Sequence, residues 1–85
     1  MGEVVIYTRD GCGLCDEARA ELEALRAELP PFRLREVDIE SDTRFHAAYL
    51  ERIPVFAIEG REVCELGLDG DAVARALASA SGKPG

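Results

Sequence analysis

Hydrophobic residues recur along the chain in two spacings, one typical of strands and one typical of helices. Apolar runs rich in β-branched residues predict four strands, at residues 3–7, 32–39, 55–58 and 62–66. Apolar residues at every third or fourth position predict three helices, at about residues 14–29, 42–50 and 70–78. The predicted order is therefore strand, helix, strand, helix, strand, strand, helix.

Each predicted helix has one apolar side that we expect to be buried. These expected buried residues are Leu14, Ala18, Leu22, Leu25 and Leu29 in the first helix, Phe45, Ala48 and Tyr49 in the second, and Val73, Ala76 and Leu77 in the third. Pro30 and Pro31 end the first helix. Either Ser41 or Asp42 caps the second, and Asp69 opens the third.

The strands predict an α/β fold with a four-stranded mixed sheet and helices on both faces. Residues 3–7 form a continuous apolar run, typical of a central strand covered on both sides. In residues 32–39 the alternation changes phase between Leu34 and Val37, which indicates a bulge or a strand contacted from both sides. The first two strands, joined by a long helix, should be parallel neighbours with a right-handed crossover. The last two should form an antiparallel hairpin through residues 59–61.

The composition fits one small soluble domain. The chain has 85 residues, 47% of them hydrophobic and 32% charged. From residue 79 the chain should fray, so we expect a domain at residues 1–80 and a tail at 81–85. The net charge of −7 and the absence of a basic cluster exclude nucleic acid and anionic membranes as expected partners.

The sequence also favours a cytoplasmic location. Its longest apolar run is too short to span a membrane, and its first residues lack the pattern of an export signal. An odd number of cysteines, three, does not suit a framework of structural disulfides.

Cys12 and Cys15 are the main candidates for chemistry. They lie three positions apart where the first strand ends and the first helix begins. The positive end of the helix dipole favours a thiolate at Cys12, and two sulfurs at this spacing can form a disulfide without moving the backbone. Gly11 and Gly13 leave the approach to Cys12 open. The pair therefore predicts redox chemistry or metal binding.

Three segments carry a resemblance to a known family. They are residues 7–15 (Tyr-Thr-Arg-Asp-Gly-Cys-Gly-Leu-Cys), Val37-Asp38-Ile39 and Arg52-Ile53-Pro54-Val55. In this element order the chain resembles the glutaredoxin-like proteins of the thioredoxin superfamily, from residue 4 to about residue 78. The resemblance implies a thioredoxin-like fold and a thiol–disulfide oxidoreductase that acts on protein or small-molecule disulfides.

The resemblance also implies roles for individual residues. Cys12 would be the attacking thiolate and Cys15 the resolving thiol. Pro54 would follow a cis peptide bond beside Cys12, leaving the N–H and C=O of Ile53 free to pair with an extended substrate. Arg9 would favour the thiolate and contact the substrate.

The chain departs from glutathione-using glutaredoxins at three places. Those proteins commonly show Cys-Pro-Tyr-Cys, Thr-Val before the proline and Gly-Gly after the fourth strand, where this chain has Cys-Gly-Leu-Cys, Arg52-Ile53 and Leu66-Gly67. It also lacks the tryptophan usual in thioredoxins. The electron donor therefore stays open between glutathione as a co-substrate and a reductase, with no tightly bound cofactor. Further cations that could bind the carboxylates of glutathione are Arg44, Arg52 and Arg61, although a solvated surface arginine is the simpler interpretation of each.

Two alternatives from other classes compete with the redox interpretation. Cys12, Cys15, Cys64 and His46 are four ligands of the types that zinc accepts, although zinc sites usually combine two closely spaced pairs. An iron–sulfur cluster bridging two copies of the chain is a related possibility. The second alternative is a binding module that has this fold but no catalytic turnover. Cys64, taken on its own, is more typical of a small buried hydrophobic residue.

Overall fold

The computed structural model describes residues 2–81 and confirms the predicted order of elements. The elements are β1 (Gly2–Thr8), α1 (Gly13–Leu25), β2 (Phe32–Asp38), α2 (Thr43–Tyr49), β3 (Val55–Ile58), β4 (Arg61–Glu65) and α3 (Gly70–Ser81), with 3-10 turns at Arg26–Glu28 and Ile39–Ser41. α3 continues through residues 79–81, where the sequence predicts fraying. The rest of the expected tail lies outside the described residues.

The four strands form one mixed sheet in the order β2-β1-β3-β4. β1 is parallel to β2 and antiparallel to β3, and β3 and β4 form the expected antiparallel hairpin. The register of β1 with β2 is unbroken from the pair Gly2 and Phe32 to the pair Thr8 and Asp38, so β2 has no bulge. The alternation of apolar and polar residues in β2 changes phase because Leu34 and Val37 face opposite sides of the sheet. The irregularity lies instead in the hairpin, between Phe56 and Ala57 of β3.

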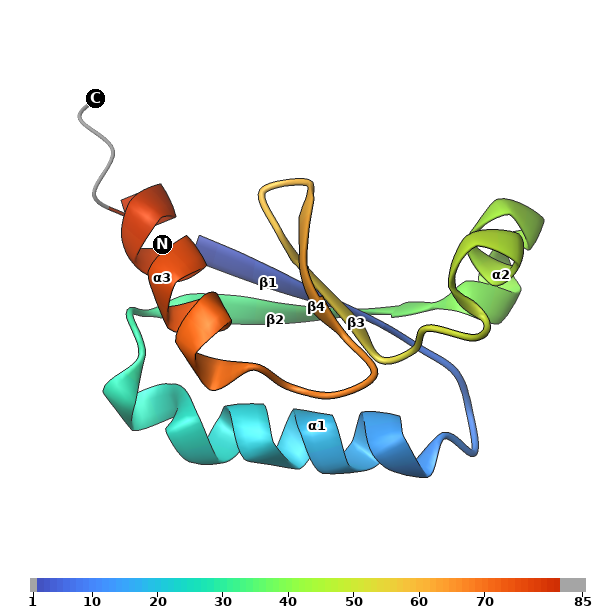
Figure 1. Cartoon of the computed structure of the whole chain (residues 1–85), viewed down its shortest axis with the longest axis horizontal. Helices are drawn as coiled ribbons and strands as arrows, with labels where there is room; N and C mark the ends of the chain where they lie inside the picture. Colours follow the sequence, from blue (N-terminus) through green and yellow to red (C-terminus); the bar gives the residue numbers. More distant parts are fainter. Residues whose placement is uncertain (1, 82–85) are drawn as a thin grey trace.

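The main core lies between the sheet and the two longer helices. Figure 1 shows α1 running along one side of the strands and α3 rising steeply at the left end of the molecule. Apolar side chains from both helices and from three strands meet there: Val4, Ile6, Ala18, Leu22, Phe32, Phe56, Ile58, Val73 and Leu77. Each is at most 3% exposed, so this layer supplies most of the apolar burial that stabilises the fold.

Within residues 2–81, the other face of the sheet is covered only at one end. α2 lies at that end (Figure 1), where Phe45 and Tyr49 pack against Tyr7 of β1. Val5, which points to the same face, is half-buried. Helices therefore lie on both faces, as expected, but the second face is covered less completely than the apolar run in β1 indicates.

Two residues expected in the core are exposed. Leu14 is 52% exposed because Cys15, not Leu14, begins the buried stripe of α1 that continues through Ala18 and Leu22. Ala48 is exposed because α2 turns Phe45 and Tyr49 toward Tyr7.

The hairpin turn and the helix caps follow the local sequence. Glu59 and Gly60 have φ angles of 52° and 77°, so both central residues of the turn are left-handed, as a type I′ turn requires. Asp42 caps α2, accepting a 2.8 Å hydrogen bond from the Arg44 N–H. Asp69 accepts one from the Ala72 N–H at the start of α3. Across residues 2–81, every helix is too short or too polar to cross a bilayer.

Candidate active site

Cys12 is the N-cap of α1. The chain leaves β1 at Thr8, turns through Gly11 with a φ of 78°, and returns so that the Cys12 N–H donates to the Arg9 carbonyl at 3.4 Å. The Cys12 Sγ accepts a hydrogen bond of 3.1 Å from the Cys15 N–H, one of the N–H groups that a helix leaves unpaired at its start. An anionic sulfur at this position is stabilised by the same donor and by the helix dipole.

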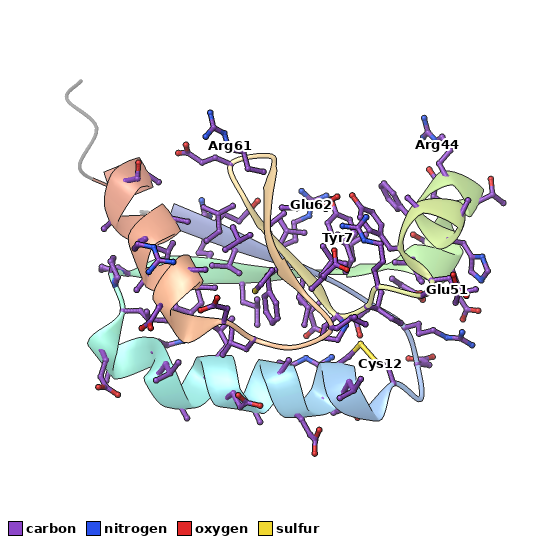
Figure 2. All side chains as sticks on the ribbon, viewed as in Figure 1. Tyr7, Cys12, Arg44, Glu51, Arg61 and Glu62 are labelled. Atoms are coloured by element: carbon purple, nitrogen blue, oxygen red, sulfur yellow. A yellow bond between two sulfur atoms is a disulfide. The ribbon has the colours of Figure 1, made fainter. Side chains whose placement is uncertain are left out.

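Cys12 and Cys15 are joined by a disulfide, with their Cα atoms 5.2 Å apart. Figure 2 shows this bond at the first turn of α1. The two residues differ in exposure, because Cys12 is half-buried whereas Cys15 is fully buried. A molecule approaching from solvent therefore reaches Cys12 first.

Ile53 and Pro54 lie beside the cysteines, and the peptide bond between them is cis. Ile53 packs with Cys15 and Ile39 in a small apolar cluster that Cys12 also contacts. The expectation that the Ile53 N–H is free is wrong, because it donates to the Tyr49 carbonyl at 3.0 Å. In the described part of the chain, no backbone N–H donates to the Ile53 carbonyl.

Three aromatic rings adjoin this cluster, two of them from the side of the second helix that the sequence predicts to be buried. The rings of Tyr7 and Tyr49 stack with centroids 4.3 Å apart, and Phe45 meets Tyr7 edge-on at 5.7 Å. Burial, together with the nearby Tyr7 and Glu62, raises the pKa of Tyr49. The spacing of Phe45 and Tyr49, one helical turn apart, is the signal that these rings share a side of α2.

Arg52 fixes the segment that leads into the cis bond. Its guanidinium forms ion pairs with Glu62 and with Glu65, the latter at 2.9 Å, and lies 5.4 Å from the centre of the Tyr49 ring. Arg44 likewise pairs with Asp42 at 2.9 Å. Both arginines are candidates for binding glutathione carboxylates, and both have carboxylate partners within the chain.

Arg9 directly follows β1, and its side chain pairs with an acidic residue. Its guanidinium is 3.8 Å from the Glu40 carboxylate, and it lines a polar cleft of about 360 Å³ at the carboxyl ends of β1 and β2. Neither cysteine lines this cleft, nor do Ile53 and Pro54. The structure therefore brings Cys12, Cys15 and Ile53 into one cluster, with Pro54 directly after Ile53, and pairs the Arg9 side chain with Glu40.

The four residues of the zinc alternative are also not brought together. Cys64 lies on β4, where its half-buried side chain packs against the main core and its Sγ accepts from the Asp69 N–H at 3.4 Å. Burial raises the pKa of the Cys64 thiol, which favours the neutral form. His46 lies on a separate element, α2. Within residues 2–81, no group of three or more His, Cys, Asp or Glu residues is arranged to hold a metal ion.

Comparison with known proteins connects this geometry to a family. The model of the glutaredoxin-like domain (DUF836) matches residues 3–78. A Nitrosomonas europaea protein solved by NMR is 32% identical and superposes with a TM-score of 0.80 over 89% of this chain and 91% of its own. A protein from X. campestris solved by X-ray is also 32% identical, with a TM-score of 0.67 over 95% of this chain and 99% of its own.

A third solved structure shows the fold alone. This mutant thioredoxin from Halobacterium salinarum is 23% identical and has a TM-score of 0.61 over 92% of this chain and 73% of its own. No curated protein matches the chain. The family model covers most of the chain, and the two solved structures at 32% identity superpose on the fold described above. The chain therefore belongs to the glutaredoxin-like domain family of the thioredoxin fold.

Proposed function

We propose that this protein is a thiol–disulfide oxidoreductase that reduces disulfides of proteins or small molecules with the Cys12–Cys15 pair. The unequal exposure of the two residues carries the proposal. Cys12 is partly exposed at the helix N-cap, and Cys15 is fully buried one turn later. Disulfide exchange needs one accessible sulfur to attack the substrate and a second sulfur close to the first to finish the reaction.

The first step starts from the dithiol. The Cys12 thiolate attacks one sulfur of the substrate disulfide, a bond forms between these two sulfurs, and the other substrate sulfur leaves as a thiolate. The Cys15 N–H, 3.1 Å from the Cys12 Sγ, and the helix dipole stabilise the attacking thiolate.

The second step releases the product. Cys15 loses its proton to solvent and its thiolate attacks the Cys12 sulfur of the mixed disulfide, so that the second substrate sulfur leaves as a thiolate. Two electrons have then passed from the cysteine pair to the substrate. The separation of 5.2 Å between the two Cα atoms suits this ring closure without backbone movement. An electron donor, either glutathione or a dedicated reductase, returns two electrons to the pair.

The substrate chain would lie against Ile53 and Pro54. The free carbonyl of Ile53 can accept one hydrogen bond from an extended substrate backbone, in the manner of strand addition. Arg9 acts mainly through its own backbone, because its carbonyl holds the Cys12 N–H and its guanidinium pairs with Glu40. We place this reaction in the cytoplasm, where thiols are kept reduced.

Three cysteine variants test the proposal with insulin as the substrate and dithiothreitol as the reductant. Cys12→Ser should abolish insulin reduction. Cys15→Ser, reduced and then freed of dithiothreitol before insulin is added, should accumulate a mixed disulfide visible by non-reducing electrophoresis and mass spectrometry. Cys64→Ser is the matched control and should keep wild-type activity. Full activity of Cys12→Ser, or loss of activity in Cys64→Ser alone, would overturn the assignment.

The same preparation separates the other candidates. A binding module would show no turnover in the wild-type protein, and a bridged iron–sulfur cluster would give a visible absorption band. Supplying electrons from glutathione with its reductase in one assay, and from thioredoxin reductase in another, identifies the donor.

A further inference from the structure

The polar cleft at the carboxyl ends of β1 and β2 has an excess of negative charge. Its volume is about 360 Å³, and its charged lining residues are four carboxylates and two guanidiniums, from Asp10, Asp16, Glu36, Asp38, Arg9 and Arg19. Arg9 also pairs at 3.8 Å with Glu40, which lies outside the lining, so part of its positive charge is already compensated. The cleft therefore attracts a cation.

Thr8 gives the cleft a polar group that no other part of the described chain satisfies. The residue lines the cleft and is 7% exposed, and its Oγ1 is buried without a hydrogen-bond partner. In the register of β1 and β2 it is paired with Asp38, whose side chain points to the same face of the sheet. A buried hydroxyl without a partner destabilises a fold, so its presence in a cleft is a reason to look for a ligand.

Two carboxylates of the cleft have negative charge left for that ligand. Within residues 2–81, neither Asp10 nor Asp38 forms an ion pair. Asp38 accepts a hydrogen bond of 2.8 Å from the Glu40 N–H with its Oδ1, which leaves its Oδ2 for a ligand. A cation in the cleft can therefore meet a carboxylate and the Thr8 hydroxyl together, because both accept hydrogen bonds.

Arg19 connects the two walls of the cleft. Its guanidinium pairs with Asp16 of α1 and with Glu36 of β2, each at 2.9 Å. Its Nε is buried without a partner, but an Nε–H can only donate and would not contact a cation directly. Because these ion pairs lie within the chain, the walls are held in place before any ligand binds, which lowers the cost of binding.

The lining of the cleft adjoins both cysteines along the chain. Gly11 lines the cleft and directly precedes Cys12, and Asp16 lines it and directly follows Cys15. Consecutive Cα atoms are about 3.8 Å apart, so each of these lining residues starts one residue away from a cysteine. A polypeptide joined to Cys12 through a disulfide therefore needs only a few residues to bring a long side chain to the cleft.

We propose that the polar cleft binds the ammonium or guanidinium group of a basic side chain in a protein substrate, close in sequence to the disulfide that Cys12 attacks. This inference rests on the proposed function and adds the substrate class, which is a disulfide with a nearby lysine or arginine. The bound cation donates to the Thr8 hydroxyl and to the Asp38 carboxylate, and Asp10 attracts it. The net charge of −7 favours encounter with such a substrate.

Two series of synthetic disulfide peptides test this inference. One series carries a lysine at successive positions after a cysteine, and the other carries glutamine at the same positions. At about 0.01 M salt, we expect kcat/KM for the best lysine peptide to exceed that of its glutamine counterpart about three- to tenfold, mainly through KM, as one partly exposed ion pair and one hydrogen bond imply. This preference should fall toward one at about 1 M salt, because salt screens the charges.

Two variants place the cation in the cleft. Asp38→Asn removes a charge and keeps an oxygen that can accept from the Glu40 N–H, and it should reduce the lysine preference to about twofold or less. Thr8→Val should also reduce the preference while the Tm rises, so a loss of stability is not the cause. Asp71→Asn is the matched control, because it removes an exposed carboxylate of α3 that does not line the cleft, and it should keep the wild-type preference.

Equal kcat/KM for lysine and glutamine peptides would overturn this inference and leave the proposed function standing. A lysine preference that persists in both Asp38→Asn and Thr8→Val would also overturn it, since the cation would then bind outside the cleft. If the wild-type protein reduces neither series, the proposed function fails and this inference fails with it.

Discussion

The hydroxyl of Thr8 offers the sharpest test of the packing. Thr8 is the last residue of β1 and lies on the buried face of the sheet, in register with Val4 and Ile6. The residue is only 7% exposed, and its Oγ1 is buried without a hydrogen-bond partner among the described residues. Replacement by valine keeps the β-branched shape and exchanges the hydroxyl for a methyl group, so Thr8→Val should stabilise the protein.

The size of the effect follows from two contributions. A buried polar group that lacks a partner costs about 1–3 kcal/mol, which the valine variant recovers. The added methyl contributes up to about 0.8 kcal/mol more through burial. In a domain of this size, 1 kcal/mol shifts the Tm by about 4–8 °C. The Tm of Thr8→Val should therefore rise by at least about 4 °C.

Thermal unfolding of the oxidised protein, followed by circular dichroism, measures this shift. Thr8→Ser is the control, because it keeps the hydroxyl, loses the methyl and should lower stability by about 1 kcal/mol. If Thr8→Val lowers the Tm instead, the hydroxyl has a hydrogen-bond partner and the reasoning fails.

Other predictions concern the turn, one cap and the free thiol. Glu59 and Gly60 both have left-handed backbones, so Glu59→Asn should raise the free energy of unfolding by about 0.5–1 kcal/mol and Gly60→Ala should lower it by about 1–2 kcal/mol. Urea unfolding measures both changes. Equal effects of the same sign would refute the type I′ turn. Hydrogen bonds from the Arg44 side chain and N–H hold the pKa of Asp42 below its usual value. The stability that this carboxylate contributes is therefore present above the unfolded-state pKa and is lost as pH falls through the folded-state pKa. Asp42→Asn should weaken the dependence of Tm on pH in that acidic range, and an unchanged dependence would contradict this. In the oxidised protein Cys64 is the free thiol, with a pKa raised by burial. At a pH of about 8, close to the ordinary pKa of a thiol, iodoacetamide should modify Cys64 more slowly than N-acetylcysteine, and the difference should vanish in denaturant.

Local signals in the sequence are sufficient to predict the order of helices and strands and the hairpin of β3 and β4. Pro30 and Pro31 fix the end of the first helical segment. Of the two residues predicted to cap α2, Ser41 and Asp42, the structure shows Asp42 as the cap. The orientation of α1 is harder to predict, because the apolar spacing can be counted from Leu14. Cys15 is fully buried and begins the stripe, so a cysteine considered for its chemistry also belongs to the hydrophobic pattern.

Other features depend on contacts between distant segments. The Ile53 N–H is used because a turn after α2 directs it to the Tyr49 carbonyl, which no residue pattern indicates. The ion pairs of Arg52 with Glu62 and Glu65 require the register of β4, including the irregularity in its pairing with β3. The incomplete cover of the second sheet face follows from length, since α2 has seven residues and spans roughly 10 Å, against roughly 23 Å for the seven-residue β1.

The strand order leaves β2 and β4 at the two borders of the sheet, where each offers unpaired backbone groups to another chain. Both borders carry exposed charged side chains, with Arg33 and Arg35 on β2 and Arg61, Glu62 and Glu65 on β4. A strand that docked on either border would have to approach these charges, so growth into fibres or stacked sheets is opposed.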